Sequence, residues 1–205
     1  MKRNRYDLKE ISNNINDYTK IIYIANPDNP MGTYITKAEF DKFYRSVPDR
    51  VLIILDEAYF EYAKDFKRYP NSMNYRYDNV ITLRTFSKAY GLAGIRVGYG
   101  FAHDSLIENL LKVKAPFEPS LLGQIAASAA LKDQLFLEKS IKLNAFGIEY
   151  LENEFTKMGI NFISSSTNFI TTIWPTEKIA SQITQSLLKK GFIVRQLTAF
   201  GSPNY

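Results

Sequence analysis

Three short segments of the chain are apolar without polar alternation, at 21–25, 51–55 and 80–83. Uninterrupted runs of this length are typical of strands that are buried on both faces of a parallel sheet. Between the first two, Thr36 and Glu39 have the spacing of a capping box and begin an amphipathic stretch that ends near Pro48. This order of strand, helix and strand predicts an α/β fold with a mainly parallel sheet.

The rest of the chain continues the mixed pattern. It predicts further strands at 95–101, 160–163, 168–174 and 192–195. It predicts helices at 105–114, from 120 to about 131, at 133–158 and at 177–190. The segment 133–158 is long enough to bridge two domains. We therefore expect a partial large domain at 1–132, a connecting helix at 133–158 and a partial small α/β domain at 159–205.

Composition narrows the class of protein. A hydrophobic share of 45% in 205 residues supports a real core and argues against intrinsic disorder. We find neither a bilayer-length apolar run nor a signal-peptide core after Met1, so we expect a cytoplasmic protein without membrane partners. With no cysteine and with His103 as the one histidine, thiolate and histidine-rich metal sites are excluded. The net charge of +5 is scattered along the chain, which argues against nucleic-acid binding.

Polar groups follow each of the three apolar runs. The segments are 26–32, 56–59 and 84–88. Each alone has an ordinary explanation as a turn, a cap or a surface charge. Ligands of open α/β sheets, however, bind beyond the carboxyl ends of the strands, where these three segments would meet. Together they offer an amide, a carboxylate, a phenol, hydroxyls and an amine, which suit an aromatic cofactor bound through a lysine.

Three motifs carry a resemblance to a known family. They are Asn29-Pro30-Met31-Gly32, Asp56-Glu57-Ala58-Tyr59 and the stretch from Thr85 to Gly98. With these motifs, and along essentially its whole length, the chain resembles the pyridoxal-phosphate (PLP) aminotransferases of fold type I, most closely the histidinol-phosphate aminotransferase branch. The resemblance implies PLP as the cofactor, a small-molecule amino donor, a keto-acid acceptor and a homodimer in the full-length family.

The resemblance also implies roles for individual residues. Lys88 would bind the PLP aldehyde as a Schiff base and then move the proton between the substrate α-carbon and the cofactor. Asp56 would pair with the protonated pyridine nitrogen. Asn29 and Tyr59 would hydrogen-bond the phenolic oxygen of the ring. The phosphate would be held by two hydroxyls and a guanidinium, those of Thr85, Ser87 and Arg96.

Four other residues have weaker cases. By resemblance, Arg195 would contact the phosphate end of histidinol phosphate, although a surface charge at a strand end is about as plausible. Asn168 would satisfy loop backbone, and His103 stands at an expected helix start, where a capping or surface role fits better than catalysis. Glu57 would point away from Asp56 along extended backbone and serve structure.

The sequence departs from the family at several points. Met31 stands where the motif usually has threonine, which loses a hydroxyl but keeps the turn. The family's N-terminal arm, its phosphate-binding loop and its ring-stacking aromatic residue do not precede Tyr6, and the arginine that grips the substrate α-carboxylate does not follow 200–205. We therefore expect the chain to correspond to the middle of an aminotransferase.

The leading hypothesis is transamination in histidine biosynthesis, in which histidinol phosphate and 2-oxoglutarate give imidazole acetol phosphate and glutamate. One alternative is a PLP-dependent decarboxylase acting on a phosphorylated amino acid, which would use the same cofactor groups. Another is a remnant without catalysis of its own. The sequence leaves open whether this chain alone is active.

Overall fold

The computed structural model describes residues 4–75 and 77–205, and its centre is a four-stranded sheet in the order β1-β2-β3-β4. The strands are β1 (Ile21–Ala25), β2 (Leu52–Asp56), β3 (Val80–Thr85) and β4 (Gly98–Phe101). The first three are parallel, and β4 runs antiparallel to β3. The predicted α/β fold with a mainly parallel sheet is confirmed.

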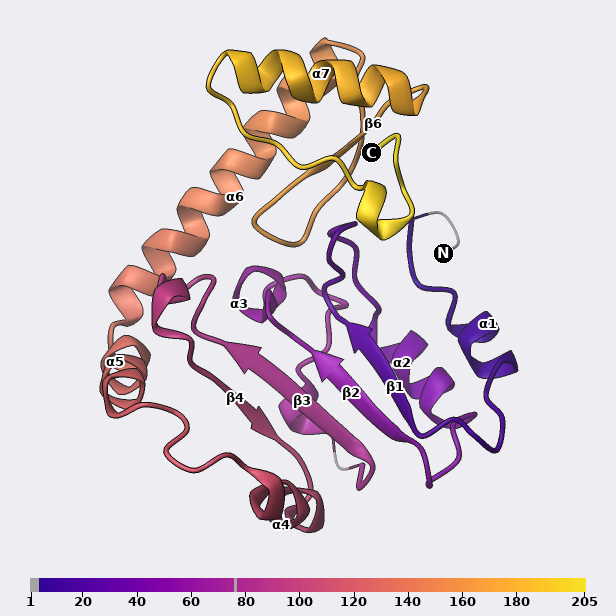
Figure 1. Cartoon of the computed structure of the whole chain (residues 1–205), viewed down its shortest axis with the longest axis vertical. Coiled ribbons are helices and arrows are strands. Elements are labelled where there is room, and N and C mark those ends of the chain that lie inside the picture. The colour runs from indigo at the N-terminus through magenta and orange to yellow at the C-terminus, as the bar shows by residue number, and fades with distance from the viewer. Residues whose placement is uncertain (1–3, 76) are drawn as a thin grey trace.

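Helices and a second, smaller sheet complete the chain (Figure 1). The helices are α1 (Leu8–Asn13), α2 (Lys37–Tyr44), α3 (Phe60–Ala63), α4 (Asp104–Val113), α5 (Leu121–Lys132), α6 (Gln134–Lys157) and α7 (Glu177–Lys189). The antiparallel pair β5 (Asn161–Ile163) and β6 (Thr171–Ile173) forms the small sheet. Helix α6 runs from beside the large sheet to the small sheet and α7. The domain boundaries at 132 and 158 stay a prediction.

The main core lies between the large sheet and α2. Ile24, Ile53 and Phe40 are almost completely buried there. The opposite face of β1 is open, with Ile21 56% and Tyr23 55% exposed. The prediction that these strands are buried on both faces is therefore wrong for β1, where buried and exposed side chains alternate. The reason is that α1 and α2 contribute to the core on one face of the sheet only.

Two helix starts confirm sequence predictions. The Thr36 hydroxyl accepts a hydrogen bond from the Glu39 N–H at 3.3 Å, and the Glu39 carboxylate accepts one from the Thr36 N–H at 2.8 Å. This reciprocal pair is the predicted capping box of α2. His103 caps α4 in a similar way, since its Nδ1 accepts from the Ser105 N–H at 3.3 Å. Its predicted capping role is confirmed.

Two predicted strands differ from the structure. The strand expected at 95–101 begins only at Gly98, because a 3₁₀ turn at 93–95 and a left-handed Arg96, with φ of 58°, precede it. The strand predicted at 192–195 is wrong: this segment has no regular secondary structure. Its side chains are largely exposed, with Ile193 at 87%. The small sheet in the described ranges consists of β5 and β6 alone, so apolar sequence at 192–195 has no neighbouring strand to pair with.

The small sheet and its connecting loop rest on the loop after β1. Ser166 donates to the Gly32 carbonyl from both its Oγ, at 2.7 Å, and its backbone N–H, at 2.8 Å. Thr171 Oγ1 donates to the Pro30 carbonyl at 2.7 Å. Near the two ends of the chain, the Tyr205 hydroxyl and Asn4 Oδ1 lie 2.9 Å apart. Among the helices of the described residues, none is long and apolar enough to cross a membrane.

Candidate active site

Three loops leave the large sheet at one edge. Strand register places Ala25 beside Asp56, and Asp56 beside Leu83, at the carboxyl ends of β1, β2 and β3. Because these strands are parallel, the loops after them emerge at the same edge. The predicted convergence of the three polar segments on neighbouring strand ends is confirmed.

An amide, a phenol and an amine lie together above this edge. Asn29 Nδ2 donates to the Tyr59 hydroxyl at 3.1 Å, which joins the loop after β1 to the loop after β2. Lys88 Nζ, from the loop after β3, lies over the Tyr59 ring at 5.2 Å from its centroid. Tyr59 is 5% exposed and packs edge-on against Phe169, with ring centroids 5.4 Å apart. The phenol therefore has a fixed position between the other two groups.

Asp56 and Glu57 follow each other in sequence, but their carboxylates have different hydrogen-bond partners. Asp56 Oδ1 accepts a hydrogen bond from the Ala58 N–H at 3.0 Å, and Oδ2 accepts one from the Tyr23 hydroxyl. Glu57 is 1% exposed, and its Oε2 accepts two hydrogen bonds from Arg84, at 2.9 and 2.8 Å. As predicted, Glu57 points away from the site into a buried ion pair.

Hydroxyls and a guanidinium gather in the loop after β3. Thr85 Oγ1 accepts from the Ser87 N–H at 3.1 Å, which shapes the start of the loop. Arg96 donates to Ser87 Oγ at 3.4 Å and to the Ala93 carbonyl at 2.7 Å. The Arg96 side chain is exposed, so its remaining donors face solvent beside a hydroxyl, an arrangement that suits an anion.

Two predicted residues are not brought into this cluster. Arg195 lies exposed in the irregular segment after α7, and within the described ranges no hydrogen bond or ion pair joins it to the residues above. Asn168 is exposed, and the loop bonds predicted for it are made by Thr167, whose Oγ1 accepts from the Phe169 N–H at 3.3 Å. The site as the structure brings it together therefore comes from the large sheet's loops.

Sequence reasoning missed three residues that support the site. Tyr23 is one position in an apolar run, and only the strand register places it near Asp56. Ser166 and Thr171 bind the backbone of a loop more than a hundred residues earlier in the chain, at separations of 134 and 141 residues. No local pattern signals contacts at such distances. Only the fold reveals them.

We expect the Thr171→Val variant to loosen the loop that carries Asn29. Valine keeps the shape of threonine but leaves the buried Pro30 carbonyl without its side-chain donor, a loss of about 1 to 3 kcal/mol. Hydrogen exchange of residues 26–33 should accelerate by about tenfold, while β2 amides keep their rates. Thr171→Ser, which retains the hydroxyl, is the control. Equal exchange in the valine and serine variants would contradict this role of the hydroxyl.

Glu61 on α3 is expected to make the free energy of unfolding depend on pH. It is 3% exposed, and burial raises the pKa of its carboxyl from 4.5 to about 7. Between these two values the folded chain holds a proton that the unfolded chain releases, so the free energy of unfolding falls as the pH rises. From pH 5 to pH 8 this loss is about 2 to 3 kcal/mol.

Urea unfolding at the two pH values measures this effect. We expect Glu61→Gln, which cannot ionise, to lose less stability between pH 5 and pH 8 than the wild type. Glu149→Gln, at an exposed position of α6, is the matched control and should follow the wild type. Identical pH profiles for Glu61→Gln and the wild type would show that another group titrates.

Comparison with models of known protein families assigns the chain to a family. The family model for aminotransferase class I and II matches residues 2–205. The chain belongs to this family.

Curated relatives are similar over the whole chain. Histidinol-phosphate aminotransferase 2 of Carboxydothermus hydrogenoformans is 42% identical over 207 residues, covering 100% of this chain and 57% of its own length. Histidinol-phosphate aminotransferase 2 of Hydrogenovibrio crunogenus is 43% identical over 198 residues, covering 96% of this chain and 52% of its own length. This aminotransferase chain therefore spans little more than half the length of the curated relatives it matches.

A solved structure supports the same assignment. Histidinol-phosphate aminotransferase from Sinorhizobium meliloti, in complex with pyridoxal-5'-phosphate, matches with a TM-score of 0.88 and 32% sequence identity. The match covers 95% of this chain and 54% of that one. The backbone arrangement of the two aminotransferases thus agrees over nearly all of this chain.

Proposed function

We propose that this chain carries the lysine-bearing part of a PLP-dependent aminotransferase site, and that the reaction is the transamination of histidinol phosphate with 2-oxoglutarate. The observation that carries the proposal is the meeting of Asn29, Tyr59 and Lys88 at the strand ends, within 3.1 Å for amide to phenol and 5.2 Å for amine to ring. The relatives named histidinol-phosphate aminotransferases support the choice of substrate.

The residues present fit PLP by the chemistry of their donors. The carboxylate of Asp56 complements a pyridinium, and the amide and phenol of Asn29 and Tyr59 can donate to a phenolate oxygen. The hydroxyls and guanidinium of the loop after β3 suit a phosphate, and the primary amine of Lys88 suits an aldehyde. When bound, PLP supplies a conjugated ring that absorbs the electrons left on the substrate α-carbon.

Each side chain then has a task of its own. With PLP bound, Lys88 Nζ would hold its aldehyde carbon and, once the substrate amine has taken that place, would serve as the base that moves the proton of the substrate α-carbon. Asp56 would favour the protonated form of the pyridine nitrogen by offering it a negative charge. Asn29 holds the Tyr59 hydroxyl, and both stabilise the ionised phenolic oxygen. Thr85, Ser87 and Arg96 anchor the phosphate.

The wider setting is part of the same proposal. We expect Arg195 to contact the phosphate end of the substrate, the assembled enzyme to be a homodimer, and its location to be the cytoplasm. Substrates would be small molecules, an amino donor and a keto-acid acceptor. The boundaries of a large part at 1–132, a bridging helix at 133–158 and a small part at 159–205 belong to this picture.

The experiment is to mix the purified chain with PLP, reduce with borohydride and locate the added pyridoxyl mass by peptide mapping. The proposal expects the label at Lys88. A transamination assay with histidinol phosphate and 2-oxoglutarate follows, and release of a keto product without CO₂ separates this reaction from decarboxylation. No label, or label spread evenly over surface lysines, would overturn the proposal for this chain.

A further inference from the structure

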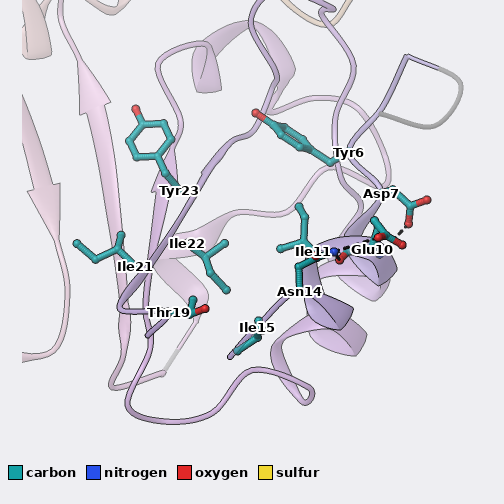
Figure 2. A pocket seen from close by; sticks show the side chains of 10 residues that line it. All are labelled: Tyr6, Asp7, Glu10, Ile11, Asn14, Ile15, Thr19, Ile21, Ile22 and Tyr23. Carbon is teal, nitrogen blue, oxygen red and sulfur yellow. Dashed lines mark hydrogen bonds between the residues drawn. The ribbon is translucent and has the colours of Figure 1, made fainter. Parts of the chain in front are cut away.

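The side chain of Tyr23 lies on the open face of the large sheet. The proposed function gives this residue no role. It pairs in register with Ile54 on β2, so its side chain stands on the same face as Asp56, two residues further along. Figure 2 shows Tyr23 and Tyr6 among the residues that line a cavity of about 460 Å³ beside β1. The Tyr23 hydroxyl points away from Ile21, toward the carboxyl end of the strand.

The two tyrosines of this cavity serve different carboxylates. Burial and the charge of Asp28, in the loop after β1, raise the pKa of the Tyr6 hydroxyl. Tyr23 donates to Asp56 Oδ2, while the Ala58 N–H donates to Oδ1 at 3.0 Å. Both oxygens of Asp56 are therefore held, one by backbone of its own loop and one by a neighbouring strand, and this fixes the rotation of the carboxylate.

The phenol of Tyr23 stays a donor over the whole working range of pH. Partial burial, together with the hydrogen bond and the charge of Asp56, raises the pKa of the hydroxyl well above its usual range. It cannot take the proton that Asp56 is to keep on the cofactor, because a neutral phenol is a far weaker base than a carboxylate. Its contribution is therefore orientation and not proton transfer.

We propose that Tyr23 is a positioning residue for Asp56, and that its hydroxyl holds the carboxylate in the orientation in which it meets the pyridine nitrogen of the cofactor. This inference rests on the proposed function, because it takes Asp56 as the partner of that nitrogen. The phenylalanine variant removes the hydroxyl alone and keeps the ring that covers the strand.

The test compares the wild-type chain with Tyr23→Phe and with Tyr18→Phe, a control at a position that is 89% exposed. In the chain without cofactor, NMR three-bond couplings between the α and β protons of Asp56 report its side-chain rotamer. We expect one rotamer in the wild type and in Tyr18→Phe, and averaged couplings in Tyr23→Phe. With PLP added, we expect Tyr23→Phe to raise the dissociation constant three- to tenfold and to shift the absorbance band of the bound cofactor.

The outcomes separate this inference from the proposed function. Unchanged Asp56 couplings in Tyr23→Phe overturn the inference, and so do averaged couplings with wild-type PLP affinity and spectrum. If the wild-type chain itself gains no PLP label at Lys88, the proposed function fails. The couplings then still decide between an orienting role for Tyr23, if they average in Tyr23→Phe, and none, if they do not.

Discussion

Replacing Lys88 with alanine is expected to abolish the covalent attachment of PLP. Alanine has no amine to attack the aldehyde, so the borohydride-stabilised label at this position should disappear from the peptide map. In any preparation that transaminates, the rate should fall by about 10²- to 10⁴-fold, because the group that moves the substrate proton is lost as well. Peptide mapping and a keto-acid assay measure the two effects separately.

A second lysine provides the control for this result. Lys139 is exposed on α6, where alanine suits the helix. Lys139→Ala should keep both the label at residue 88 and the rate. Covalent PLP or full turnover in Lys88→Ala would mean that another amine serves the reaction. The assignment of Lys88 would then be lost.

Replacing Arg84 with methionine is expected to cost about 3 to 5 kcal/mol of unfolding free energy. The Arg84 and Glu57 side chains are 5% and 1% exposed, and the change leaves the Glu57 carboxylate buried without its partner. Arg84 also donates to Asn71 Oδ1 at 3.2 Å and stacks over the Phe60 ring at 3.3 Å, so several contacts are lost together. Urea unfolding at pH 8 measures the loss.

The pH dependence identifies the ion pair as the cause. Burial already raises the pKa of Glu57, while Arg84 lowers it, so removing the arginine should raise this pKa further. The variant should therefore lose less stability at pH 5, where protonation of Glu57 is easier, than at pH 8. Arg68→Met, at an exposed arginine, is the control and should stay within about 0.5 kcal/mol of the wild type. An equal loss in both variants would contradict the role of the buried pair.

Most of the large sheet could be predicted from sequence because its signals are local. The apolar runs at 21–25, 51–55 and 80–83 gave strands within a residue or two of their bounds. The capping box at Thr36 marked a helix start that needs only four neighbouring residues. The failure at 192–195 has the opposite cause, since a strand exists only when another strand pairs with it.

The candidate site divides in the same way. The polar segments that contain Asn29, Asp56, Tyr59 and Lys88 follow strand ends and could be located from the sequence, whereas the roles proposed for these residues come from the family resemblance. The hydrogen bonds that hold them come from distant residues, such as Tyr23 and Thr171, whose partners depend on strand register and on the return of the chain. The hydrophobic periodicity of the sequence indicates neither the strand register nor the contacts between distant loops.

The contact between the small sheet's loop and the loop after β1 determines which substitutions these two loops can tolerate. Ser166 and Thr171 both bind main-chain carbonyls, those of Gly32 and Pro30. Every residue type offers the same carbonyl, so the bonds put no demand on the side chain that lies between them. Met31 is buried at 3% exposure, and its side chain takes no part in these hydrogen bonds. A substitution at position 31 is therefore expected to be limited by the space available to its side chain, whereas loss of the hydroxyl at 166 or 171 removes one of these hydrogen bonds.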